Sequence, residues 1–241
     1  MACKYIIKPR IGPNKGKEVE SKLYNDLVNL TGSEKAADEA YTKVHHPNFL
    51  RWFGDWINNK KVIGFTSEGE VETKYTRGDV SQVVDENGEP LIVYHGTYAE
   101  FDTFEIEISG GYWFTRDKSR AKFRGKNVIP TFLNIKNMYD HGSMYNRYAD
   151  LPVDVTDLFI QHPEADGIFG NEYAQTVEEW QDPLLSHAYV VKESNQIKHA
   201  TENVGTFSVE PSIKQQKLNE ELMLEDNHER IPHTIMKGML E

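Results

Sequence analysis

The sequence contains little that would support a disulfide, a membrane span or secretion. Only one cysteine, Cys3, occurs in 241 residues, so no internal disulfide can form and the fold does not depend on an oxidising compartment. No apolar run approaches the roughly 20 residues needed to cross a bilayer. Residues 1–13 hold basic side chains but no apolar segment, which predicts no secretory signal. These absences predict a cytoplasmic protein.

Several catalytic motifs are missing as well. The nine histidines include no HExxH, and adjacent His45 and His46 point in different directions, so we expect no metal site. No GxSxG is present, and Cys3 lies in a segment expected to be flexible, which argues against a serine or cysteine hydrolase. The formal net charge of −11 argues against general nucleic-acid binding and against a nuclease that uses His95 as its base.

Four parts can be distinguished along the chain. Residues 1–18 carry five basic side chains before the first acid and predict a basic, flexible arm. Residues 19–60 predict a helical N-terminal region, and residues 61–213 predict the main domain. Residues 214–241 predict a C-terminal helix and tail, with a polar helix at 215–226.

The helical region begins with apolar residues at helical spacing, which are Val19, Leu23, Leu27 and Leu30. Gly32 follows them as a C-terminal cap. Thr31 and Glu34 resemble a capping box, which predicts a second helix that ends before His45.

Residues 47–57, PNFLRWFGDWI, place five apolar side chains at positions i, i+3, i+4, i+7 and i+8. Aromatic rings on a helix can stack on nucleic-acid bases. A stripe this regular is more typical of a core, however. We therefore expect these rings to attach the helical region to the rest of the protein.

From residue 62 the pattern changes to strands. Asn87 and Gly88 lie between two apolar runs, which is typical of a β-hairpin. Further strands are predicted at 128–137, 166–170, 188–192 and 204–210, with a helix at 117–123. Because strands predominate over long helices, we expect an α+β fold with an antiparallel or mixed sheet rather than a doubly wound parallel one.

His95 ends the strand-like stretch LIVYHGT (91–97) and is followed by Gly96. A histidine at a strand end can direct a ring nitrogen at a hydroxyl, while glycine lets a ligand approach the backbone. Aromatic rings farther along could hold a flat heterocycle by stacking and cation–π attraction. Taken singly, His95 also fits a hydrogen-bonded structural histidine, the rings at 112–114 fit a core, and Gln196 fits a turn or helix cap.

Five sequence blocks together favour one family. They are WFGDW (52–56), VVDENGEPLIVYHGT (83–97), GYWFT (111–115), AYVVKESNQIKHA (188–200) and GTF (205–207). The segment from about Lys60 to Ile213 resembles the ADP-ribosyltransferases, which include diphtheria-type toxins and poly-ADP-ribose polymerases. It looks most like the version found in large polyvalent proteins of bacteriophages and mobile elements. The resemblance implies a split mixed or antiparallel sheet that uses NAD as its substrate and needs no metal.

The resemblance also implies a role for each residue of an NAD site. His95 would hydrogen-bond a ribose hydroxyl, and the backbone of Gly96 would hold the nicotinamide carboxamide. Trp113 and Phe123 would sandwich the nicotinamide, with Tyr112 replacing Trp113 if the register differs by one. The expected NAD-binding residues are His95, Gly96, Thr97, Tyr112, Trp113 and Phe123.

Ala188 departs from the pattern of the family, whose EYVV glutamate would stand at this position. That carboxylate stabilises the oxocarbenium-like sugar, and losing such a group commonly costs on the order of 10²–10³ in rate. Three interpretations remain open: a deliberate replacement of glutamate, substitution by Glu193, Glu172 or Gln196, or a degenerate NAD-binding scaffold. Glu193, five positions on, should face the opposite side of the strand. The catalytic candidates are therefore position 188, His95 and Gln196.

The resemblance implies an NAD-dependent mono-ADP-ribosyltransferase, a glycosyltransferase that passes ADP-ribose to an unknown acceptor, with a protein favoured. The alternative is a catalytically degenerate protein of a virion or mobile element that binds NAD or a partner. The expected location is the cytoplasm, of the host if a phage encodes the chain, or the virion. Neither a membrane nor nucleic acid is an expected partner. Acceptor specificity would depend on loops such as 138–165.

Overall fold

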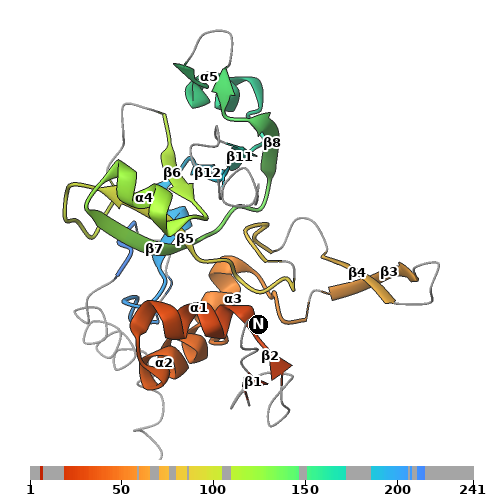
Figure 1. The fold of residues 1–241 in the computed structure, drawn as a ribbon. Helices are drawn as coiled ribbons and strands as arrows, with labels where there is room; N and C mark the ends of the chain where they lie inside the picture. Colours follow the sequence, from red (N-terminus) through yellow and green to blue (C-terminus); the bar gives the residue numbers. More distant parts are fainter. Residues whose placement is uncertain are drawn as a thin grey trace, which may run out of the picture.

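The structure is a computed structural model, and it describes residues 6–7, 19–58, 60–65, 71–75, 80–85, 87–104, 110–146, 151–171, 186–205, 207 and 211–214. Figure 1 shows helices α1 to α3 grouped at one end of a β-sheet, with α4 beside the sheet and α5 near its other end. The helix predicted at 215–226 and most of the basic arm lie outside the described residues.

Helix α1 (Lys22–Thr31) is capped at its start by Ser21 and at its end by Gly32. The Ser21 hydroxyl accepts a hydrogen bond from the Tyr24 N–H at 3.0 Å, and Gly32 ends the helix with φ 67°. The predicted C-terminal cap is therefore confirmed. The predicted start was three residues early, because Val19 belongs to strand β2 (Val19–Glu20), which pairs with β1 (Ile6–Ile7).

Helix α2 (Glu34–Val44) ends before His45, as predicted, but its cap differs. Ser33 caps the helix by accepting a hydrogen bond from the Ala36 N–H. Thr31, the predicted cap, instead donates its hydroxyl hydrogen to the Leu27 carbonyl at the end of α1. The short linker between the two helices therefore holds one cap for each.

Helix α3 (Pro47–Phe53) ends at Gly54, whose φ of 102° is unfavourable for other residues. Trp56 consequently lies in a turn rather than on the predicted long helix, although it remains buried with the α3 rings. The predicted core role of this aromatic stripe is confirmed. The helical cluster consists of Leu23, Tyr24, Leu27, Ala37, Ala40, Tyr41, Val44, Phe49, Trp52, Phe53, Trp56, Val80, Ile92, Phe132, Ala200 and Phe207.

Because this cluster includes Ile92 and Phe132, the helices and the sheet share one core. Phe132 lies edge-on to Phe49 with ring centroids 5.4 Å apart, which joins a strand directly to α3. The expected docking of the helical region onto the following residues is thus present in the fold.

Seven strands form one sheet in the order β13-β7-β5-β6-β12-β11-β8. All neighbours are antiparallel except β8 and β11, which are parallel. The predicted α+β fold with a mixed sheet is therefore confirmed. The strands are β5 (Val93–Thr97), β6 (Tyr112–Thr115), β7 (Asn127–Leu133), β8 (Met138–Ser143), β11 (Gly167–Asn171), β12 (His187–Val191) and β13 (Ile197–His199).

The sheet is divided between β5 and β6. Within the described residues, these two strands share one register pair, Tyr94 with Thr115, whereas β5 and β7 are paired along all of Val93–Thr97. One half of the sheet is β13-β7-β5, and the other is β6-β12-β11-β8. This arrangement agrees with the split sheet that the family resemblance implied.

Two further apolar clusters lie on opposite faces of β12. The central cluster consists of Val83, Leu91, Val93, Phe104, Tyr112, Phe114, Leu133, Ile135, Tyr189, Val191, Ile197 and Ile213. The outer cluster consists of Met144, Val155, Leu158, Phe159, Ile168, Ala188 and Val190. Alternate β12 residues belong to alternate clusters, because neighbouring side chains of a strand point to opposite faces.

Several smaller elements complete the fold. Helix α4 (Lys118–Arg124) confirms the helix predicted at 117–123, and it lies beside β5 in Figure 1. Helix α5 (Val155–Gln161) lies in the stretch expected to be a loop, and it buries Val155, Leu158 and Phe159 in the outer cluster. The remaining elements are β3 (Lys60–Phe65), β4 (Val71–Tyr75), β9 (Tyr145–Asn146), β10 (Leu151–Pro152) and the 3₁₀ helix η2 (Ser194–Gln196).

The turn predicted at Asn87 and Gly88 is confirmed. Gly88 has φ 74°, and Val84 bridges Pro90 across the turn. The strand predicted at 204–210 is not formed where the structure describes it, because residues 204, 205 and 207 are irregular. None of the helices in the described ranges has the length and hydropathy of a membrane span.

Candidate functional site

Three sequence motifs lie side by side at the centre of the sheet. Tyr94 of β5 pairs with Thr115 of β6, and Thr115 in turn pairs with Ala188 of β12. Adjacent strands are about 4.8 Å apart, so Ala188 lies roughly 10 Å from Tyr94. The YHGT, YWFT and AYVV segments, which are far apart in sequence, therefore meet at the split.

His95 spans the split in the sheet. Its Nδ1 lies 2.9 Å from the carbonyl oxygen of Trp113, next to the single register pair between β5 and β6. Only 8% of the residue is exposed, and its ring packs edge-on to Phe104 with centroids 5.0 Å apart. The imidazole thus links the halves of the sheet where regular strand pairing has stopped.

The contact with Trp113 also determines the tautomer of His95. A carbonyl oxygen can only accept, so Nδ1 carries the hydrogen and donates it. In the neutral ring, Nε2 is then the acceptor. An acceptor nitrogen can receive the hydrogen of a hydroxyl group, such as that of a ribose.

Gly96 is required by the packing of α4 on β5. A Cβ atom at this position would lie 1.8 Å from the carbonyl oxygen of Ala121. Gly125, after α4, is similarly constrained, because its Cβ would lie 2.2 Å from the carbonyl carbon of Thr97. The glycine was predicted to admit a ligand, whereas the space that it leaves is filled by the α4 backbone.

Thr97 follows Gly96 at the end of β5. Its hydroxyl accepts a hydrogen bond from the Ala99 N–H at 3.1 Å, which shapes the turn after the strand. The hydrogen bond of the Thr97 side chain is thus local, whereas its backbone pairs with Asn127 of β7.

The structure distinguishes Tyr112 from Trp113. Tyr112 is 3% exposed, belongs to the central cluster and donates its hydroxyl hydrogen to the Phe104 carbonyl at 3.3 Å. Trp113 points to the opposite face, where it is partly buried against the outer cluster that contains Ala188. Tyr112 is therefore a core residue in this structure, and Trp113, on the opposite face, is the better placed of the two for the predicted stacking role.

Phe123 is unusual among the aromatic residues because 72% of it is exposed. It lies on α4, two residues after Ala121, whose carbonyl contacts β5. It makes no ring contact with any aromatic side chain in the described ranges. Exposure of a large ring on a packed helix is compatible with stacking on a ligand, although Phe123 and Trp113 do not touch each other.

Ala188 occupies the centre of the sheet and is 1% exposed. It lies between Thr115 on β6 and Gly170 on β11. A Cβ on Gly170 would come within 2.8 Å of the Met144 side chain, so Met144 covers the space next to Ala188. A glutamate at position 188 would have to extend past these apolar neighbours toward Trp113 and Thr115.

Gln196 has a structural role in which its amide is fully occupied. The Oε1 atom accepts hydrogen bonds from the backbone N–H groups of Lys192 and Glu193 at 3.2 and 2.8 Å. The Nε2 atom donates to the carbonyl oxygens of Asn134 and Asp166 at 2.9 and 2.8 Å. The proposal of Gln196 as a catalytic amide is therefore not supported, and its interpretation as a cap or turn residue is.

The other two candidate substitutes for the glutamate give no support either. Glu193 is exposed beyond the end of β12, before η2. Glu172 lies outside the described residues.

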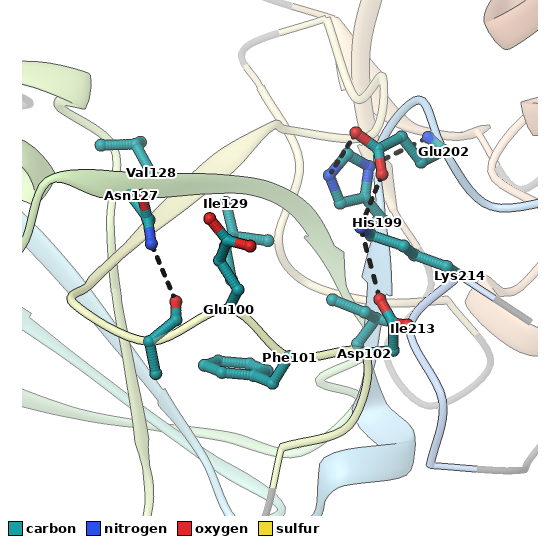
Figure 2. A pocket seen from close by; sticks show the side chains of 11 residues that line it. Glu100, Phe101, Asp102, Asn127, Val128, Ile129, His199, Glu202, Ile213 and Lys214 are labelled. Atoms are coloured by element: carbon teal, nitrogen blue, oxygen red, sulfur yellow. Dashed lines mark hydrogen bonds and ion pairs between the residues drawn. The ribbon is translucent and has the colours of Figure 1, made fainter.

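A second group of polar side chains, which sequence interpretation missed, lines a cavity of about 450 Å³ near the end of β5. Figure 2 shows His199, Glu202, Lys214 and Asp102 along one wall, with Glu100 and Phe101 opposite them. Lys214 Nζ lies 2.8 Å from Glu202 Oε2 and 3.3 Å from Asp102 Oδ1. These residues come from three separate parts of the sequence, so no local pattern indicated the cavity.

His199 is the histidine among the residues that line the cavity. Burial lowers its pKa to about 4, against an opposing effect of Glu202. Its Nδ1 accepts hydrogen bonds from the backbone N–H groups of Thr201 and Glu202, so the hydrogen of the neutral ring is on Nε2. Nε2 lies 3.8 Å from Glu202 Oε1, beyond hydrogen-bonding distance.

The described residues contain no group of three or more His, Cys, Asp or Glu side chains placed to hold a metal ion. The two adjacent histidines have structural contacts instead. His45 Nδ1 contacts the Tyr41 carbonyl at 2.8 Å, and His46 accepts a hydrogen bond from the Asn48 N–H at the start of α3.

Comparison with models of known protein families identifies a family. A family model described as ADP-ribosyltransferase in polyvalent proteins matches residues 85–207, half of the chain. The matched span contains all seven strands of the main sheet together with α4 and α5. No curated protein matches the chain.

Proposed function

The chain belongs to the family of ADP-ribosyltransferases in polyvalent proteins, and from this premise we propose that it binds NAD at the split between β5 and β6. The observation that carries the proposal is the row Tyr94, Thr115 and Ala188, which aligns the three motifs of an NAD site across adjacent strands. The proposed activity is mono-ADP-ribosyl transfer, in which NAD is a substrate.

Each half of the sheet contributes to NAD binding. From the β5 half, Nε2 of His95 accepts a hydrogen bond from a ribose hydroxyl, and the Gly96 backbone holds the carboxamide. From the β6 half, Trp113 provides one face for the nicotinamide ring. Phe123 on α4 moves over the other face, for which its exposed ring is suited.

Transfer breaks the bond between C1′ of the ribose and the nicotinamide nitrogen, and nicotinamide leaves with the electron pair. The sugar carries a developing positive charge until an acceptor nucleophile bonds to C1′ and releases its proton. A carboxylate beside the ribose would stabilise this charge in the transition state. With Ala188 in that place, the chain keeps the groups that bind NAD but lacks the charge that accelerates its cleavage.

A degenerate NAD-binding or partner-binding protein is the second candidate. The observation in its favour is that Ala188 is enclosed by the outer cluster and by Met144 over Gly170. A carboxylate in such surroundings is costly unless it is paired. An apolar cluster of this kind fits a chain whose position 188 has adapted to alanine.

Nicotinamide release from NAD, together with self-labelling, tests the two candidates in the chain as it stands and in Ala188→Glu. If the transferase proposal holds, glutamate raises the rate by roughly 10²–10³. Ala188→Gln is the matched control, because it has nearly the same volume without the charge. Circular dichroism and thermal unfolding of both variants establish that the substitution leaves the fold intact.

His95→Ala in the Ala188→Glu background should abolish the restored release. Binding of NAD by the unaltered chain, measured by calorimetry, separates the remaining cases. Binding without cleavage by a folded Ala188→Glu variant supports the degenerate scaffold. Absence of both binding and cleavage refutes NAD as the ligand and leaves a partner-binding protein.

A further inference from the structure

We propose that the exposed side of α4, together with Tyr98 directly after β5, binds a single-stranded nucleic acid. This inference goes beyond the proposed function, because it adds a second ligand and assigns to it none of the side chains proposed for NAD. In Figure 1, α4 lies beside β5, so the helix and the end of the strand adjoin. Single-stranded DNA and RNA share the chemistry in question, which is a row of phosphates with unstacked bases.

The stretch from Arg116 to Lys126 is opposite in charge to the molecule as a whole. It contains six basic residues and one acid, Asp117, whereas the formal net charge of the chain is −11. Total negative charge argues against general binding to nucleic acid, but phosphate contacts depend on the local arrangement of cations. The expectation that nucleic acid is not a partner was based on the total charge, and it did not consider this stretch.

Four of the six cations are exposed and form what we call the basic strip, which consists of Lys118, Lys122, Arg124 and Lys126. Lys118 and Lys122 are four residues apart on α4 and therefore share one side of the helix. None of the three lysines takes part in the described ion pairs. The strip thus presents positive charge to the solvent.

The one acid of this stretch has a structural role at the start of α4. The Asp117 carboxylate accepts a hydrogen bond from the Ser119 N–H at 2.8 Å and so caps the helix. The acid therefore lies at one end of the basic strip, and the three cations from Lys122 to Lys126 follow without another acid between them.

Tyr98 adds an exposed aromatic ring, since 73% of the residue is accessible to solvent. The backbone on both sides of it is held by hydrogen bonds. The Ala99 N–H donates to the Thr97 hydroxyl at 3.1 Å, and Asn127 Nδ2 donates to the Ala99 carbonyl at 3.1 Å. A large ring on a turn fixed in this way offers a hydrophobic face on which a nucleic-acid base can stack.

The ring and the basic strip adjoin through the backbone. A Cβ atom on Gly125 would lie 2.2 Å from the carbonyl carbon of Thr97, and Thr97 pairs with Asn127 of β7. Residues 124–127 therefore run directly against residues 97–99. Proteins that bind single strands combine cations for the phosphates with aromatic rings for the bases. Tyr98 favours such a strand over an acidic protein, whose carboxylates need no stacking ring.

Fluorescence anisotropy of the full chain at low salt, about 50 mM, tests the proposal with four labelled probes. They are a DNA strand of twelve thymidines, an RNA strand of twelve uridines, a DNA duplex of the same length and a blocked peptide of twelve glutamates. We expect at least one single strand to bind about tenfold more tightly than the peptide and about fivefold more tightly than the duplex. Equal or tighter binding of the peptide would assign the strip to acidic proteins and overturn the proposal.

The salt dependence of the binding reports the phosphate contacts. Three or four contacts to a single strand predict that the logarithm of the binding constant falls with the logarithm of the salt concentration with a slope of about −2 to −3. Binding that does not change with salt would contradict a role for the basic strip.

Substitutions locate the binding. Lys122→Glu and Lys126→Glu, each alone, should weaken binding of the single strand about fivefold and make its salt dependence shallower. Tyr98→Ala should weaken it at least about fivefold without changing the salt dependence, whereas Tyr98→Phe should retain the affinity because the ring remains. Lys35→Glu makes the same change of charge on the exposed side of α2 and should alter the affinity less than about twofold. Equal affinities for Lys126→Glu and Lys35→Glu would refute the site.

Titration of the single strand in the presence of NAD separates this proposal from the proposed function. Unchanged affinity supports a second ligand with a surface of its own. Competition between the strand and NAD would show that the basic strip belongs to the NAD site, and the proposal would fall. If NAD does not bind, the anisotropy titrations still decide whether the strip takes a single-stranded nucleic acid.

Discussion

At the scale of single residues, Gln196 shows how a motif residue can be important without touching a ligand. Its amide joins η2 to the segments at Asn134 and Asp166 through backbone groups. These partners lie 62 and 30 residues away in the sequence, so the motif itself could not reveal them. The sequence identified the residue as special, and the fold supplies the reason.

Gln196→Ala tests this structural role. The substitution leaves two backbone N–H groups and two carbonyls without their side-chain partner, and at roughly 1 kcal/mol each the free energy of unfolding should fall by about 3–4 kcal/mol. Urea denaturation followed by circular dichroism measures the loss. Asn195→Ala, at the exposed neighbouring position, should cost less than about 0.5 kcal/mol. Equal stability of the two variants would contradict a structural role for Gln196.

His199 predicts a dependence of stability on pH. Its folded pKa is lowered to about 4 from 6.5, mainly by burial. Between these values the unfolded chain takes up a proton that the folded chain does not bind. The free energy of unfolding should therefore fall as the pH decreases from about 6.5 to about 4.

His199→Asn removes this titration while keeping a side-chain oxygen for the backbone N–H groups that His199 caps. Denaturation at several pH values should give a shallower slope for this variant than for the unaltered chain. His46→Asn, which replaces a histidine at an exposed position, is the control variant. If the free energy of unfolding had the same pH dependence in both variants, burial of His199 would not be the cause of that dependence.

At the scale of elements, the first helix is connected to the central sheet through a carboxylate. Glu89, which follows the Asn87-Gly88 turn, accepts hydrogen bonds from the Ser21 hydroxyl at 3.0 Å and the Leu23 N–H at 3.1 Å. A negative charge at this end of α1 is favoured by the helix dipole. Burial nevertheless raises the pKa of Glu89, against the effect of these hydrogen bonds. Two effects therefore oppose each other at Glu89: burial disfavours its ionised form, and the hydrogen bonds from Ser21 and Leu23 favour it.

Glu89→Ala should loosen α1 more than the sheet. It leaves the Ser21 hydroxyl and the Leu23 N–H without an acceptor, at a cost of about 1–3 kcal/mol. Hydrogen exchange followed by mass spectrometry should show faster exchange in residues 22–31 than the unaltered chain does. Glu39→Ala, on the exposed face of α2, is the control and should leave that exchange unchanged. Uniform acceleration over the whole chain would contradict a local role for Glu89.

The elements also show which predictions from sequence succeed. The helix end signalled by Gly32 was placed correctly. Few residues other than glycine readily adopt the left-handed backbone conformation that ends many helices, so a glycine after an apolar helical pattern is a specific signal. The helix expected over 47–57 is shorter in the structure. The apolar residues keep helical spacing beyond Gly54, but the helical backbone ends at Phe53. Helix α5 was missed since its apolar face is short and its partners come from other elements.

At the scale of the whole molecule, the order of the sequence blocks was enough to predict the family and the split sheet. Pairing of Tyr94, Thr115 and Ala188 then follows from the fold of that family. The acidic cavity was not predictable in the same way. Its wall combines Asp102, His199 and Lys214, which only the folded chain brings together.

The division between β5 and β6 has a consequence for how this protein could be taken apart or recombined. Along the described strands, the chain passes from β5 to β6, back to β7, over to β8 and finally from β12 to β13, so it crosses between the halves repeatedly. No single cut in the backbone would release either half as a continuous fragment. A continuous piece of chain that contains all strands of one half therefore also contains strands of the other half, so the two sides of the site can only be produced together.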